Sequence, residues 1–167
     1  MDGLHTSDCP PPFRPTLTLV RLKAGEQMTF RILSERVFGL YTHWNGKKSS
    51  PCLKDPAECQ GCKRGYSTRW KGFLHVLNVQ TQRQLIFECT AFATSLFLDQ
   101  VEDRRHLRGL RVLCERSRGA DNGRLKMTLL PGTTSFIDLP VEVCPLATLE
   151  KLWGEKPPPV ENNGQAM

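Results

Sequence analysis

The feature that most constrains this chain is a set of four soft metal ligands within one short stretch. His43, Cys52, Cys59 and Cys62 follow the spacing H-x8-C-x6-C-x2-C. Thiolate and imidazole donors brought together from one loop are the usual ligands of tetrahedral zinc. The sequence therefore predicts a structural zinc site here, because four protein ligands leave no position open for water or a substrate.

The three cysteines carry this prediction, and the fourth ligand is left open between two histidines. In Cys59-Gln60-Gly61-Cys62 the glycine permits a tight bend that aims backbone amides at sulfur. Three unrelated cysteines and a thioredoxin-like redox pair are the alternatives, and the redox pair lacks its βαβ context. His43 is preferred because it leaves a predicted strand just before the loop, and His75 on the next strand is the competing ligand.

Length and cysteine usage bound the class of protein. A chain of 167 residues fits one domain with a real core. Its seven cysteines follow no apolar leader, which favours a reducing compartment such as the cytoplasm. Cys89 and Cys114 lie in apolar runs and are expected to be buried. No run is long enough to span a membrane, so no membrane partner is expected.

Strand-like segments dominate the hydropathy pattern. The alternation in 27–33 predicts a strand that pairs with 37–41 across 34–36, and the later hairpins are expected at 70–79 with 83–90 and at 110–116 with 124–130. Thr90 is expected to cap a helix from 91 to about 107 in which Phe92 and Leu96 share one stripe. A first strand over 16–22 and a short helix over 145–153 complete the pattern.

This order predicts a mainly β fold, an OB-fold-like small barrel with one helix and a zinc-binding loop insert. The expected organisation is a flexible Pro-rich lead-in over 1–15, a single domain over 16–154 and a flexible tail over 155–167. The zinc loop of that domain spans 43–62.

Positive charge is concentrated in two segments. The chain has 23 Lys and Arg against 17 Asp and Glu, a net charge of +6 and a sequence pI of about 9.1. Residues 47–71 hold seven basic and two acidic side chains, and residues 104–126 hold eight and two. Such clustering favours a polyanionic partner.

Aromatic residues alternate with this charge, as in proteins that stack the bases of single strands while cations follow the phosphates. The alternatives are that the tryptophans pack beneath the loop and that the arginines near residue 104 only complement a helix dipole. The predicted nucleic-acid contacts are Trp44, Lys47, Lys48, Lys63, Arg64, Tyr66, Arg69, Trp70, Lys71, Arg108, Arg116, Arg118 and Arg124.

The strand pair ending in His43, the loop closed by Cys-x2-Cys, the return strand WKGFLHVLN and the late RGLRVL and GADNGRL segments resemble one family. It comprises the zinc-containing OB-fold single-stranded DNA-binding proteins of the phage helix-destabilising type. The resemblance covers roughly residues 25–132. It implies that His43, Cys52, Cys59 and Cys62 bind zinc and that DNA lies in a basic cleft. It also implies that partners include replication or recombination proteins and that the protein acts in a bacterial or phage-infected cell. The acidic tail of that family is replaced here by PPPVENNGQAM.

The leading hypothesis is a non-catalytic single-stranded DNA-binding protein. An RNA- or duplex-binding zinc module and a zinc-braced protein-interaction domain are the competing hypotheses. An enzyme is not expected, because no nucleophile and base spacing and no phosphate-cradling glycine motif is apparent.

Overall fold

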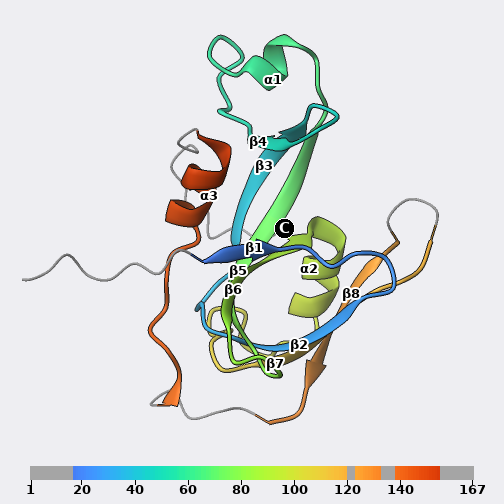
Figure 1. Ribbon diagram of the computed structural model, residues 1–167, viewed down its shortest axis with the longest axis vertical. Coiled ribbons are helices and arrows are strands. Elements are labelled where there is room, and N and C mark those ends of the chain that lie inside the picture. Colours follow the sequence, from blue (N-terminus) through green and yellow to red (C-terminus); the bar gives the residue numbers. More distant parts are fainter. Residues whose placement is uncertain (1–16, 120–122, 133–137, 155–167) are drawn as a thin grey trace, which may run out of the picture.

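The computed structural model describes residues 17–119, 123–132 and 138–154, which form a mainly β structure. Figure 1 shows a rounded body from which a narrow extension of strands projects. The predicted lead-in 1–15 and tail 155–167 lie outside the described residues. In chain order the elements are β1 (Thr18–Val20), β2 (Gln27–Ile32), β3 (Phe38–Trp44), β4 (Ser49–Pro51), α1 (Gln60–Lys63), β5 (Thr68–Asn78), β6 (Gln84–Thr90), α2 (Ala91–Leu98), β7 (Arg111–Arg116), β8 (Leu125–Leu130) and α3 (Leu146–Trp153).

The eight strands of the described residues form one sheet in the order β1-β6-β5-β2-β7-β8, with β3 and β4 branching from β5. This order ends at β1 and β8, so the pairing does not close the small barrel that the sequence predicted. β1 pairs in parallel with β6, with Leu19 opposite Ile86. It therefore occupies the edge of β6 with which β8 would have to pair to close the barrel. The described residues contain three helices: α3 confirms the short helix predicted over 145–153, whereas α1 adds a helix that was not expected within a barrel with one helix.

β5 is the strand around which the sheet is organised. One of its edges pairs with β6, and the other pairs first with β3 and then with β2. The predicted pairing of 37–41 with 27–33 is wrong. β2 and β3 pair with successive parts of β5 and not with each other. The amides of Leu33 and Ser34 both donate to the carbonyl of His75. As a result β3, β4, α1 and residues 68–73 of β5 leave the body as an extension that we call the ribbon (Figure 1).

α2 covers the main core, although not with the face that the sequence suggested. Thr90 caps the helix as predicted, and its Oγ1 accepts a hydrogen bond from the Ala93 amide at 3.3 Å. The helix buries Ala93 and Phe97, whereas Phe92 and Leu96 are 54% and 49% exposed. The expected stripe therefore faces solvent.

The helix ends at Leu98, well before the expected end near Leu107. The carboxylate of Asp103 accepts a hydrogen bond from the Arg105 amide at 2.9 Å, a local turn that competes with helical pairing. The side chain of Gln100 instead bonds to the backbone of β8. These polar contacts turn the chain away from the helix axis.

Two apolar clusters lie on opposite faces of β5, because successive side chains of a strand alternate. Leu74 belongs to the main cluster beneath α2, and Phe73 belongs to a second cluster beneath α3. The rings of Phe73 and Trp153 meet edge to face with centroids 5.9 Å apart. Cys89 and Cys114 are buried in the main cluster, as predicted.

His75 is a core residue that ties the C-terminal segment to the sheet. Its Nδ1 accepts a hydrogen bond from the Val143 amide at 3.0 Å, so Nε2 carries the proton and donates to Gln84 Oε1 at 3.0 Å. Burial lowers the pKa of His75 and thereby favours the neutral ring that makes both bonds. Both ring nitrogens are thus engaged away from the cysteines.

Candidate metal centre and nucleic-acid interface

The four predicted metal ligands meet at the tip of the ribbon. His43 lies on β3, Cys52 follows β4, and Cys59 and Cys62 bracket the first turn of α1. Their ligand atoms all lie within 4.8 Å of one another. The Sγ atoms of Cys52 and Cys62 are 3.7 Å apart, and Cys62 Sγ is 3.4 Å from His43 Nε2. Metal–sulfur bonds of about 2.3 Å in a tetrahedron give an edge of about 3.8 Å, so these donors can hold a metal ion.

The orientation of the His43 ring also fits a metal ligand. Its Nδ1 lies 2.9 Å from the carbonyl oxygen of Tyr66, which can only accept a hydrogen bond. Nδ1 therefore carries the proton, and the lone pair of Nε2 points towards Cys62. A histidine that binds a metal through one ring nitrogen commonly donates the N–H of the other nitrogen to a backbone carbonyl in this way. Of the two histidines left open by the sequence, His43 is the one that joins the cysteines.

Cys59 and Cys62 ionise with different ease in the cluster. Burial raises the pKa of Cys59, but hydrogen bonds from the amides of Cys62 and Leu53 outweigh it and bring the pKa to about 6. Burial and then the neighbouring thiols of Cys52 and Cys59 raise the pKa of Cys62 to about 11. Cys52 and Cys59 thus oppose the ionisation of Cys62 until a positive ion lies between the sulfurs.

Gly61 is required for contact with the histidine, not for the bend that the sequence suggested. It lies within α1 and is buried. A β-carbon added to it would lie 2.3 Å from Cδ2 of His43. Only a glycine lets the helix approach the imidazole this closely.

We expect Gly61→Ala to weaken metal binding by about 10- to 100-fold, the usual effect of displacing a ligand's support. A loss of metal affinity would be informative, because alanine forms helices better than glycine by about 1 kcal/mol and would by itself stabilise α1. Competition with a chromophoric chelator measures the affinity. Gln60→Ala is the matched control, since Gln60 is exposed in the same turn. Equal metal affinity of the two variants would contradict the steric explanation.

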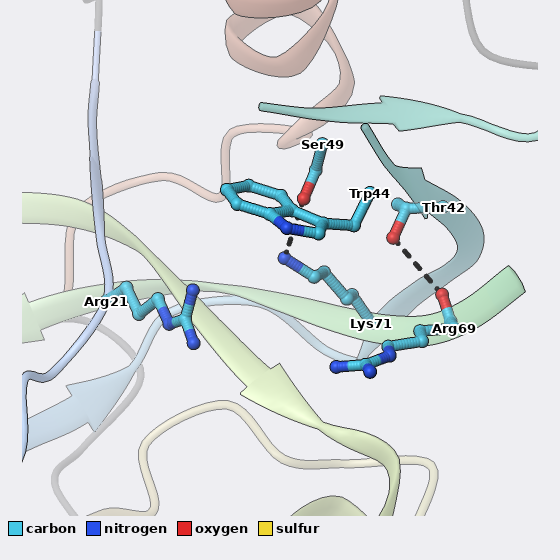
Figure 2. Close-up of a pocket in the computed structure, with 6 residues that line it drawn as sticks. All are labelled: Arg21, Thr42, Trp44, Ser49, Arg69 and Lys71. Carbon is cyan, nitrogen blue, oxygen red and sulfur yellow. Dashed lines mark hydrogen bonds between the residues drawn. The ribbon is translucent and has the colours of Figure 1, made fainter. Parts of the chain in front are cut away.

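A cationic hollow lies where the ribbon joins the body, and Figure 2 shows the side chains that line it. Trp44 comes from β3, Arg69 and Lys71 come from β5, and Arg21 follows β1. Lys71 Nζ is 3.1 Å from Ser49 Oγ, beside the Trp44 indole (Figure 2). Trp44 is 49% exposed. One indole and three cations therefore converge from separate elements.

Glu88 on β6 partly balances this charge. Its Oε1 lies 2.9 Å from Lys71 Nζ and 4.0 Å from Arg21 Nε. Three cations and one carboxylate leave a net charge of about +2 at the hollow, enough to attract phosphates. Arg21 was absent from the predicted contacts, because only the pairing of β1 with β6 brings it here.

The two ribbon tryptophans have different environments. Trp70 lies between Arg69 and Lys71 on β5, so it points to the opposite face of the strand. There it is half-buried, and β-carbons added to Gly39 and Gly72 would come within 2.3 and 2.8 Å of its indole. Trp70 therefore packs against Gly39 and Gly72 of the ribbon, whereas Trp44 is open to solvent.

Several other predicted contacts lie away from the hollow. Exposed positions at the β3–β4 turn and at the end of α1 hold Lys47, Lys48, Lys63 and Arg64, and Tyr66 is half-buried beside His43. None of the five is among the described residues that line the hollow. Arg108 is used structurally, because its guanidinium donates to the carbonyls of Leu33, Leu139 and Pro140.

The predicted arginines of the β7–β8 hairpin line a second concave area. Arg116 and Arg124 border a hollow with Phe92 and Thr90, while Arg118 and Lys126 line a neighbouring hollow that Arg116 and Arg124 also border. Burial, and next the charge of Arg21, lower the pKa of Arg116. Phe92 was not among the predicted contacts, since its place in a helical stripe suggested the core.

No protein-family model, curated protein or solved structure matches this chain. Among the described residues, no helix has the length and apolar character needed to cross a bilayer.

Proposed function

We propose that this protein binds single-stranded DNA without catalysing a reaction. The observation that carries the proposal is the hollow in which the exposed Trp44 indole lies beside Arg21, Arg69 and Lys71. A base can stack on the indole while the cations neutralise adjacent phosphates, and stacking of this kind contributes about 1–3 kcal/mol per base. Duplex DNA hides its base faces, so the same hollow favours an unpaired strand.

The element order supports an OB-like domain as the framework. β2, β5 and β6 are followed by α2 and then by β7 and β8, which is the layout expected of five OB strands with a helix before the last two. In that framework the ribbon occupies the connection between the first two strands, and the β7–β8 hairpin is the last connection. Oligonucleotides commonly bind between these two connections.

We further propose that the metal is zinc and that its contribution is structural. His43, Cys52, Cys59 and Cys62 supply the nitrogen and sulfur donors that zinc prefers, and all four tetrahedral positions would be filled by protein. Between residues 45 and 66 the buried residues are Pro51, Cys52, Cys59 and Gly61. With so little apolar burial, the tip depends on its metal for order.

Fluorescence anisotropy with labelled oligo-dT of about 12 nucleotides tests the proposal. We expect binding that weakens with salt, with a logarithmic slope of about −2 if three phosphates are neutralised at about 0.7 each. Unlabelled single-stranded DNA should compete better than RNA or duplex of equal length. No binding at low salt, or equal competition by duplex, would contradict the proposal, and better competition by RNA would favour the RNA alternative.

A further inference from the structure

Phe92 is a large aromatic side chain that the fold leaves uncovered. It lies in the first turn of α2 and is 54% exposed, while Phe97 of the same helix is fully buried. Within the hollow that it lines, the guanidinium carbon of Arg124 lies 5.2 Å from the centroid of its ring. Exposed aromatic rings beside cations are the combination with which proteins bind the bases and phosphates of single strands.

The Phe92 hollow is adjacent to the Trp44 hollow. Lys71 of the Trp44 hollow and Thr90 of the Phe92 hollow are direct cross-strand partners on β5 and β6. Such partners have Cα atoms about 4.5–5.5 Å apart. On the body side, Arg21 of the first hollow lies close enough to Arg116 of the second to disfavour its protonated form. The two hollows thus border each other along one rung of the sheet.

We propose that Phe92 and Arg124 form a second base-stacking subsite, continuous with the Trp44 hollow, so that a bound single strand crosses from the ribbon to the β7–β8 hairpin. This inference rests on the proposed function and extends it to the path of the strand. One base stacks on Trp44 and a later base stacks on Phe92. The backbone between them passes the cations Lys71 and Arg21, and Arg124 neutralises a phosphate beside the second base.

Oligonucleotide length separates this proposal from a single-site interface. OB domains occupy about 4–16 nucleotides, so labelled oligo-dT of about 4 and about 12 nucleotides serves as a short and a long probe. We expect Phe92→Ala to weaken binding of the long probe about tenfold and to leave the short probe nearly unchanged. Phe92→Tyr should retain most of the affinity for the long probe, because its ring can still stack.

Leu96→Ala is the matched control, because Leu96 is equally exposed one helical turn later and does not line the hollow among the described residues. Circular dichroism should show that all three variants are folded. The proposal is overturned if Phe92→Ala binds the long probe as tightly as Leu96→Ala does. It is also overturned if Phe92→Ala loses affinity for the short and the long probe by the same factor. Failure of the unmodified protein to bind either probe would instead overturn the proposed function, and the second subsite with it.

Discussion

Cys62→Ser is expected to abolish stoichiometric metal binding and to disorder the ribbon while the body stays folded. Cys62 contacts both Cys52 and His43, so its loss removes the thiolate that joins the two sides of the centre. Among the described residues, none from 38–73 belongs to the main apolar cluster. Metal binding and packing of the main core are therefore separable, whereas Leu40 and Phe73 at the base of the ribbon remain packed in the second cluster.

Metal analysis by mass spectrometry and amide hydrogen exchange measure the two effects. The metal content should fall from about one ion per chain towards zero, and the amides of β3, β4 and α1 should lose protection. Since Trp44 and Arg69 belong to the ribbon, affinity for oligo-dT should fall about 10- to 100-fold. The body should still unfold cooperatively.

Cys144→Ser provides the control, because Cys144 is an exposed cysteine outside the ribbon. This variant should keep its metal and its affinity for DNA. Retention of metal by Cys62→Ser would contradict the assigned ligand set. Loss of metal with unchanged hydrogen-exchange protection of the ribbon amides would show that the tip is ordered by packing alone.

Trp44→Ala is expected to weaken binding of single-stranded DNA by about 5- to 150-fold, the equivalent of one lost stack at about 1–3 kcal/mol. The indole is half-exposed and packs little, so the variant should unfold at nearly the same temperature as the unmodified protein. The salt dependence of binding should change little, because the cations of the hollow remain. Anisotropy titrations at several salt concentrations measure both quantities.

Tyr41→Ala is a close control for the loss of an exposed aromatic ring. Tyr41 is 53% exposed on the same strand, three residues from Trp44, and side chains at that spacing point to opposite faces. It does not line the hollow among the described residues. Equal losses from the two variants would indicate a nonspecific surface effect and would contradict stacking on Trp44.

Local patterns explain why the metal ligands could be identified from the sequence. Cys59 and Cys62 are separated by two residues, and the spacing of ligands along one loop is a local property that a metal imposes. Cys52 and His43 were added because they border the same loop, and the structure brings all four together. The choice between His43 and His75 needed the fold, since only the partners of each ring, Tyr66 and Val143, distinguish them.

Predictions that depended on long-range pairing were less successful. Segment 37–41 has an ordinary strand pattern, and nothing in it indicates that its partner is β5 and not β2. The apolar spacing of Phe92 and Leu96 is equally suited to a core face or to an exposed binding face, and α2 buries the neighbouring face instead. The parallel pairing of β1 with β6, which leaves the barrel unclosed and brings in Arg21, joins segments almost 70 residues apart.

The sequence by itself determined a mainly β chain, the three cysteine ligands and the concentration of positive charge around them, because each depends on residue type and short spacing. The tertiary structure alone decided which of those charges act together. It placed Arg69 and Lys71 beside Trp44, turned Trp70 to the opposite face, and brought the Phe92 hollow up to the Trp44 hollow along one rung of β5 and β6. The reason is physical: a binding surface is assembled from strand register and edge pairing, and these are fixed by contacts between distant segments.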